Sequence, residues 1–276
     1  MNQVRQAAVA GSFYPGQKQT LADDVYTLLD ANRPAETEAC ISPKAIIVPH
    51  AGYIYSGPTA AAAYARLVAM RDTIKRVILL GPVHRVAVRG LALPGADAFT
   101  TPLGNIQIDQ TAAASIENLP QVVISPDAHA AEHSLEVQLP FLQSVLEDFK
   151  LVPLAVGDAA PEEVAEVLDI LWGGVETLIV ISSDLSHFLP YQAAQAVDSQ
   201  TVKNILSLQH TLSHEQACGG TPVNGLLLAA KRHRLRPQLL DLRNSGDTAG
   251  DKNRVVGYAS FAFTADNTEE NSDASK

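Results

Sequence analysis

The sequence has few cysteines, few aromatic residues and no long hydrophobic run. Its 276 residues include two cysteines, Cys40 and Cys218, and neither belongs to a CxxC pair. This cysteine count excludes a disulfide framework. Because aromatic residues make up only 5% of the chain, Ala, Val, Leu and Ile must build the core. The hydrophobic fraction of 46% is enough for a sizeable core.

Basic stretches and export signals are also missing. The formal net charge is −10 and no basic stripe occurs, which argues against a nucleic-acid partner. Solubility alone accounts for such an acidic balance. The first 16 residues contain no signal-peptide h-region, and no apolar run reaches transmembrane length. We therefore expect a cytoplasmic protein with no membrane partner.

Strand-like and helix-like segments alternate along the chain. This alternation predicts a single α/β domain with a mostly parallel central sheet and helices on both faces. The domain is expected to span residues 1–263. Residues 264–276 are acidic and polar and are expected to form a disordered tail.

Individual segments follow from apolar periodicity and from the positions of Pro and Gly. Short runs rich in β-branched residues predict buried strands at 44–50, 75–84, 150–157 and 176–187, with closing strands at 237–244 and 254–263. Helical patterns cover 57–70, 133–148, 160–174, 191–208 and 223–233. Pro140 is expected to kink the second of these helices. Residues 89–109 predict a hairpin or paired edge strands.

Three of the predicted strands end in histidine. His50 follows the first strand, His84 follows the second, and Asp184 and His187 end the segment SSDLSH. Ligands of parallel sheets bind outside the carboxyl ends of the strands. A single histidine after a strand is usually a solvated loop residue. Three at the same topological position predict that the imidazoles and the carboxylate converge on one functional site.

Cys218 lies in a glycine-rich turn, ACGGTPVNG, that precedes a predicted helix. Exposed N–H groups and the helix dipole at such a position favour the thiolate, which is a metal ligand. The alternative is a small buried hydrophobic residue, and the pattern alone favours this alternative. Cys40 lies in a polar linker and is assigned no role.

The segment EHSLEVQLPF contains Glu132, His133 and Glu136. These residues form either a polar helix start or a cluster that lines the cleft. His129, Glu132 and His133 also match the H-x-x-E-H pattern of inverzincin proteases, which needs both histidines on one helix. Helical periodicity begins only near His133, so we expect His129 in a loop and disfavour a protease. Hydrolase-elbow, Walker and dinucleotide-binding patterns are absent.

Several separated motifs resemble a known family. VPHAGYIYSG, LGPVH, EHSLEVQLPF, SSDLSH and ACGGTPV occur in the order seen in Memo-like proteins, and AAVAGSFYPG resembles the start of that family. The resemblance runs from the N-terminus to the final predicted strand. The family is also called AmmeMemoRadiSam system protein B. That name reflects an association with radical-SAM and AMMECR-like proteins, which the resemblance implies as partners.

The Memo-like fold is similar to that of the class III extradiol dioxygenases, which hold Fe(II) with two histidines and a glutamate. By this resemblance His50 and His84 are metal ligands, and Cys218 stands where the dioxygenases have the glutamate. His187 takes the position of the acid/base histidine, with Asp184 nearby. A thiolate makes the site softer, so one Fe(II) ion is expected first, with copper or zinc as alternatives.

The leading hypothesis is a metal-dependent oxidoreductase that acts on an unknown small molecule or peptide. His187 would transfer a proton, supported by Asp184. Glu132, His133 and Tyr53 are expected to line the pocket. A non-catalytic phosphopeptide adaptor is the alternative that eukaryotic Memo-like proteins suggest, although no arginine cluster is evident. A third interpretation is a subunit that works only with the radical-SAM and AMMECR-like partners.

Overall fold

Four parallel strands form the centre of the main sheet. The structure is a computed structural model that describes residues 3–35 and 41–266. The central strands, in spatial order, are β2 (Ala45–Val48), β9 (Thr177–Ser182), β3 (Arg76–Pro82) and β8 (Lys150–Val156). Nearly every residue in them is buried, as their continuous β-branched runs predict. All four expected central strands are present, but the fourth ends at Ser182 and not at His187, which begins a separate short strand.

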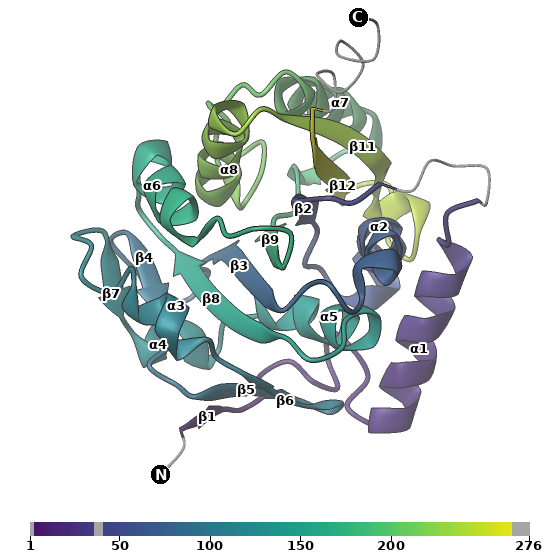
Figure 1. Ribbon diagram of the computed structural model, residues 1–276. Coiled ribbons are helices and arrows are strands. Elements are labelled where there is room, and N and C mark those ends of the chain that lie inside the picture. The colour runs from purple at the N-terminus through teal and green to yellow at the C-terminus, as the bar shows by residue number, and fades with distance from the viewer. Residues whose placement is uncertain (1–2, 36–40, 267–276) are drawn as a thin grey trace, which may run out of the picture.

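Antiparallel strands flank this centre. β12 (Val255–Ala265) pairs with β2 and also carries β10 (His187–Leu189) and β11 (Leu235–Asn244). On the other side, β4 (Leu91–Leu93) pairs antiparallel with β8 and parallel with β7 (Val122–Ile124). The sheet is thus mixed, with the parallel part at its centre, and the chain is a single α/β fold (Figure 1).

Helices cover both faces of the sheet, because alternate strand residues point to opposite faces. Ile78 and Leu80 of β3 belong to one apolar core, and Val77 and Leu79 belong to the other. The first core includes side chains of α6 (Pro161–Leu171), α7 (Tyr191–Leu206) and α8 (Gly220–Arg232). The second includes side chains of α1 (Lys18–Ala31), α2 (Tyr53–Tyr64) and α5 (Leu139–Val145).

The remaining elements are short. A small sheet contains β1 (Val4–Arg5), β5 (Ala98–Thr101) and β6 (Gly104–Gln107), and β5 and β6 form the hairpin expected within residues 89–109. Two one-turn helices are α3 (Gln110–Ala114) and α4 (Pro126–Ala130). The 3₁₀ helices are η1 (Ala65–Met70), η2 (Glu136–Gln138) and η3 (Ser245–Asp247).

Some helix limits differ from the expectation. α2 begins at Tyr53 rather than residue 57, and α1 was not predicted. Pro140 kinks no helix: it lies in the first turn of α5, where a missing N–H is tolerated, and η2 precedes it. β12 continues to Ala265, and residues 267–276 of the expected tail lie outside the described residues, as does Cys40. Within residues 3–35 and 41–266, every helix is too short or too polar for a membrane span.

Gly257 holds the segment that leads from β9 to His187. Its N–H donates to the carbonyl of Ser186 at 2.9 Å, and its own carbonyl accepts from Leu185 at 2.8 Å. Asp198 of α7 packs against Gly257 and accepts the N–H of Ser186 at 3.0 Å. A Cβ at Gly257 would lie 2.0 Å from an oxygen of Asp198, so only glycine fits there.

We expect Gly257→Ala to lower the free energy of unfolding by about 1–3 kcal/mol, because the buried Asp198 must move. Urea unfolding would measure the loss. Gly57→Ala is the matched control, since its Cβ would meet only the end of the flexible Leu28 side chain at 2.9 Å, and we expect it to cost less. Equal stability of Gly257→Ala and the natural chain would contradict the packing argument.

Candidate metal centre

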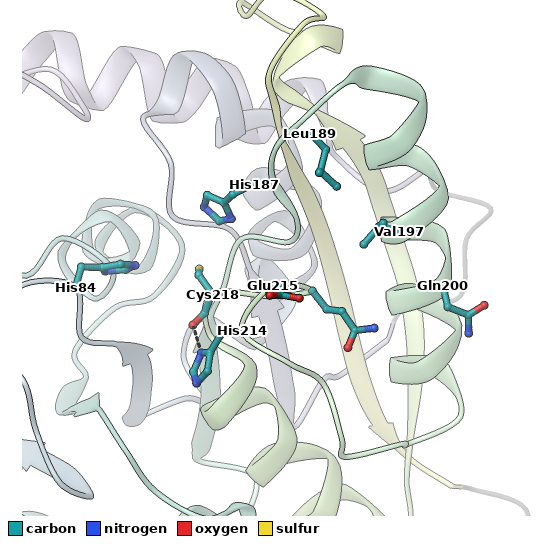
Figure 2. A pocket seen from close by; sticks show the side chains of 9 residues that line it. His84, His187, Leu189, Val197, Gln200, His214, Glu215 and Cys218 are labelled. Atoms are coloured by element: carbon teal, nitrogen blue, oxygen red, sulfur yellow. Dashed lines mark hydrogen bonds between the residues drawn. The ribbon is translucent and has the colours of Figure 1, made fainter.

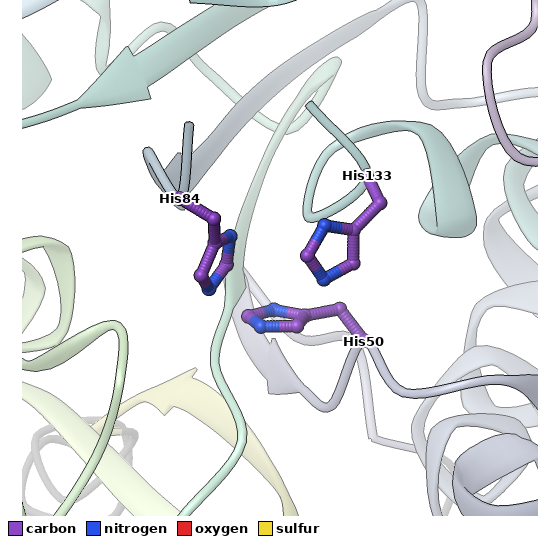
Figure 3. A group of neighbouring side chains, drawn as sticks. All are labelled: His50, His84 and His133. Carbon is purple, nitrogen blue, oxygen red and sulfur yellow. The ribbon is translucent and has the colours of Figure 1, made fainter. Parts of the chain in front are cut away.

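Three imidazoles meet at the carboxyl edge of the central strands. One ring nitrogen each of His50, His84 and His133 lies within 4.8 Å of the others (Figure 3). His50 follows β2 and His84 follows β3, as predicted, and His133 comes from the irregular segment between α4 and η2. The ring centroids are 5.2 Å apart for His50 and His84, and 4.5 Å apart for His84 and His133.

The hydrogen bonds around His50 fix its tautomer. Nδ1 of His50 lies 2.8 Å from Oγ of Ser182. The single hydroxyl hydrogen of Ser182 is donated to the carbonyl of Ser134 at 2.6 Å, and Gln138 donates to the same Oγ at 2.9 Å. Nδ1 of His50 must therefore carry the hydrogen and donate it to Ser182. The lone pair of Nε2 is left for a metal ion or another donor.

Glu132 fixes the tautomer of His84 in the same way. Its Oε1 lies 2.8 Å from Nδ1 of His84, and its Oε2 accepts the backbone N–H of His84 at 2.6 Å. Burial would raise the pKa of Glu132, but the hydrogen bonds and charge of His84, with the N–H of Ser134, lower the pKa to about 2. An ionised carboxylate can only accept, so His84 carries its hydrogen on Nδ1. Carboxylate–histidine pairs of this kind orient metal ligands.

His133 approaches the same carboxylate. Its Nδ1 lies 3.3 Å from Oε1 of Glu132. Burial and the neighbouring His84 lower the pKa of His133 to about 4. Burial and the neighbouring imidazoles also hold the pKa of His50 well below its ordinary value. Both rings are thus neutral at pH 7, which is the form that binds metal ions.

Cys218 lies beside the cluster but is not a thiolate. Its Sγ is 3.2 Å from Nε2 of His50. Burial, followed by the charge of Asp184, raises the pKa of the thiol to about 12. Desolvation thus outweighs the helix dipole in the metal-free protein, which agrees with the alternative that the sequence pattern alone favours, a small buried thiol. A coordinated metal ion would remove this proton.

Asp184 contacts His50 rather than His187. Its Oδ1 accepts the backbone N–H of His50 at 2.7 Å, and burial raises its pKa to about 6. Nδ1 of His187 lies 2.9 Å from the carbonyl of Leu185 and donates to it, which leaves Nε2 of His187 unprotonated in the neutral ring. Among the described residues, no hydrogen bond joins Asp184 to His187, so the hypothesis that Asp184 assists proton transfer by His187 rests on no direct contact.

A cavity of about 850 Å³ opens onto this centre, within the size range of ligand pockets. His84, His187 and Cys218 lie at one end of it, as Figure 2 shows. Leu189 and Val197 give it an apolar wall. Gln200, His214, Glu215 and Gln216 complete the lining.

Tyr53, Glu132 and His133 were expected to line the pocket, but none of them is among the residues that line this cavity, and neither is His129. Tyr53 is buried in the core, and its hydroxyl donates to the carbonyl of Val137 at 2.8 Å. His129 lies in α4 and not in the expected loop, and its Nε2 is 2.8 Å from the carbonyl of Ala92. Because α4 ends at Ala130, His129 and His133 share no helix face, so the inverzincin arrangement is not formed.

Sequence reasoning missed the groups behind the imidazoles. These groups are Ser182 and Gln138, and neither is among the candidate site residues of the sequence. Both are fully buried polar residues of a strand and a 3₁₀ helix. A buried serine at the end of an apolar strand, two residues before Asp184, was the one available signal for such a partner.

The low pKa of His133 predicts how the stability of the metal-free chain depends on pH. An unfolded histidine takes up a proton near pH 6.5, but folded His133 does so only near pH 4. The contribution of neutral His133 to the free energy of unfolding is therefore fully present above pH 6.5 and is lost as the pH falls toward 4. Urea unfolding across this window should show a shallower loss for His133→Gln than for the natural chain. His214→Gln, at an exposed histidine, is the control, and parallel curves for all three proteins would contradict the assignment.

Comparison with known proteins places the chain in a family. Residues 5–262 match the sequence profile of the family described as Memo-like protein. A MEMO1 family protein of Aquifex aeolicus is 38% identical, and one of Archaeoglobus fulgidus is 36% identical; each alignment covers 94% of this chain and 99% of the relative. A crystal structure of an uncharacterized Escherichia coli K12 protein aligns with 79% of this chain and 98% of its own, at 16% identity and a TM-score of 0.49.

The profile match extends over nearly the whole chain, and the identity to these relatives exceeds 30% along almost their full length. The chain therefore belongs to the Memo-like protein family.

Proposed function

We propose that this protein binds one transition-metal ion through His50, His84 and His133 and uses it in oxidoreductase chemistry. One observation carries the proposal. The Nδ1 hydrogen of His50 is bound by Ser182 and that of His84 by Glu132, and Nδ1 of His133 faces the carboxylate of Glu132 as well. Each ring then has its Nε2 lone pair available, and the three rings lie together. Neutral imidazoles suit iron, copper and zinc.

Fe(II) is the ion that the resemblance to the extradiol dioxygenases favours, with copper or zinc as alternatives. When bound, such an ion would supply Lewis-acid or redox chemistry at the end of the cavity. Cys218 is close enough to His50 to serve as a further donor once its proton is lost. Three neutral imidazoles would not compensate the positive charge of the ion, whereas the thiolate of Cys218 would reduce the net charge of the site.

His187 is the residue that we propose for proton transfer. It lines the same cavity as His84 and Cys218. Its Nδ1 is held by the carbonyl of Leu185, so its Nε2 can accept a proton from a molecule in the cavity and return it later. The apolar wall of Leu189 and Val197 would keep water from part of that molecule.

Metal content after anaerobic purification without an affinity tag tests the proposal. We expect near-stoichiometric metal in the natural chain and a large loss in His133→Ala, because a ligand is removed. His214→Ala removes a cavity histidine outside the cluster and should keep the metal. A natural chain that stays metal-free after anaerobic reconstitution with Fe(II) would remove the proposal.

Cys218→Ser decides between the two ligand sets in the same experiment. Retained metal would mean that the three histidines suffice. Loss of metal in Cys218→Ser with metal retained in His133→Ala would support the set His50, His84 and Cys218 that the family resemblance implies, and losses in both variants would add Cys218 to the three histidines. His187→Gln should keep its metal in either case, since the proposed role of His187 is proton transfer.

A second candidate function is the binding of an anionic ligand, such as a phosphopeptide, without turnover. Arg85 and Arg254 favour it, because neither pairs with a carboxylate among the described residues, whereas most other arginines do. Arg85 follows His84 in the chain, and its charge contributes to the lowered pKa of His133. Arg254 lies over the ring of Phe188 at 4.8 Å, and that ring is 5.7 Å from His187.

Phenyl phosphate is a suitable probe for this second function. We expect Arg85→Gln and Arg254→Gln each to weaken its binding about tenfold, as measured by calorimetry on metal-free protein, because a charge-assisted hydrogen bond is lost. Arg89→Gln changes the net charge equally at an arginine that pairs with Glu163, and it should have no effect. Equal affinities in all variants would exclude this candidate.

The expectation that the protein works only with radical-SAM and AMMECR-like partners stays a prediction. Activity of the isolated chain would exclude it.

A further inference from the structure

Arg5 reaches three points of the segment that carries His133. It is the second residue of β1 and only 8% exposed. Its Nε donates to the carbonyl of His129 at 3.0 Å, and its Nη2 donates to the carbonyl of Glu132 at 2.7 Å. Its Nη1 pairs with the carboxylate of Glu136. One planar guanidinium therefore contacts both ends and the middle of residues 129–136.

The partner carboxylate is held from the same side. Glu136 is fully buried, and it accepts the backbone N–H of Ala8 at 2.8 Å and that of Val9 at 3.0 Å. The hydroxyl of Tyr14 donates to it at 2.6 Å. These contacts come from residues 4–14, which we call the N-terminal strap. A buried ion pair is weak as a source of net stability, so its clearest physical effect here is a fixed geometry.

The strap also touches the candidate metal centre directly. The ring of Phe13 lies 4.8 Å from the ring of His133. The carbonyl of Phe13 accepts the N–H of Tyr53 at 2.8 Å, at the start of the helix that follows His50. The strap thus joins two segments that carry proposed ligands, although they are far apart in the sequence.

The segment with His133 needs such support, because it is not a regular element. α4 ends at Ala130 and η2 begins at Glu136, and between them a long bond of 3.3 Å from the N–H of Glu132 to the carbonyl of His129 is the helical hydrogen bond on the N-terminal side of His133. The carbonyl of Glu132 is bound by Arg5, and Oγ of Ser134 donates to the carbonyl of Pro82 at 2.8 Å. Loss of the guanidinium would free the backbone directly before His133.

We propose that Arg5 is a positioning residue for the metal centre: its bonds to the carbonyls of His129 and Glu132, with the ring of Phe13, fix Glu132 and His133 and so set the affinity of the protein for its metal ion. The inference rests on the proposed metal function and adds a group that contacts no metal. Outer groups that orient ligands typically change metal affinity by about 10–100-fold.

Arg5→Lys is the variant that tests this role in the full-length chain. Lysine keeps a positive charge beside Glu136 but cannot bind three separate acceptors through a planar fork. We expect the Kd for Co(II), followed by its d–d absorption, to rise about 10–100-fold. The absorption bands should also shift, because His133 and the His84–Glu132 pair would change their orientation.

Tyr14→Phe is the matched control. It removes one hydrogen bond to Glu136 and leaves both carbonyl contacts of Arg5 in place. We expect it to lower stability toward urea but to leave the Co(II) affinity and spectrum unchanged. A purely structural role of the strap would instead make the two variants lose affinity in proportion to their lost stability, and that result would overturn the inference.

The outcomes separate this inference from the function on which it rests. Failure of the natural chain to bind Co(II) removes both. Normal Co(II) binding and spectrum in Arg5→Lys overturn only the role of Arg5. If Arg5→Lys does not fold, Phe13→Leu decides, since it keeps an apolar side chain and removes the ring against His133. Weaker Co(II) binding by Phe13→Leu supports the strap, and unchanged binding overturns it.

Discussion

Each of three neighbouring imidazoles must keep one ring nitrogen unprotonated to bind a metal ion, and hydrogen bonds behind two of the rings determine which nitrogen that is. The hydroxyl of Ser182 and the carboxylate of Glu132 take the Nδ1 hydrogens of His50 and His84. Protonation of two adjacent rings would place like charges about 5 Å apart in a poorly solvated site, which is unfavourable. The shared tautomer of His50 and His84 and the free lone pairs of their Nε2 atoms therefore follow from the same few hydrogen bonds. The cavity chemistry depends on these bonds more than on any contact inside the cavity.

The fold positions these groups through the order of its strands. β9 lies between β2 and β3, so Ser182 at the end of β9 is next to the loop that carries His50. Apolar runs of strand length and the carboxyl-edge rule both operate within short stretches of sequence, so they predict which loops share one edge but not the strand order that brings Ser182 next to His50. The convergence of His50, His84 and His187 was expected for that reason.

The features that sequence reasoning did not reach depend on distant contacts. His133 was expected to line the pocket, but its place in the cluster depends on an irregular backbone that Arg5 holds across more than a hundred residues. No local periodicity encodes such a contact. For Cys218 the pattern alone favoured a small buried residue over a thiolate, but the nearness of Asp184, which also raises the pKa of the thiol, cannot be inferred from a helix start. Pro140 was misplaced for a simpler reason: the helix around it begins later than its apolar pattern suggests.

The carboxylate of Glu132 has two imidazoles within reach, at 2.8 Å for His84 and 3.3 Å for His133. Nδ1 of His84 is hydrogen-bonded to this oxygen and Nδ1 of His133 lies within ion-pair distance of it, so the position of one carboxylate affects both rings. A change that pulls Glu132 toward one ring weakens its support of the other, so the basicity of the two nitrogens varies in opposite directions. A change of metal preference at this centre would therefore require that His84 and His133 are altered together. The alternative is a second acceptor, so that each histidine has a separate partner.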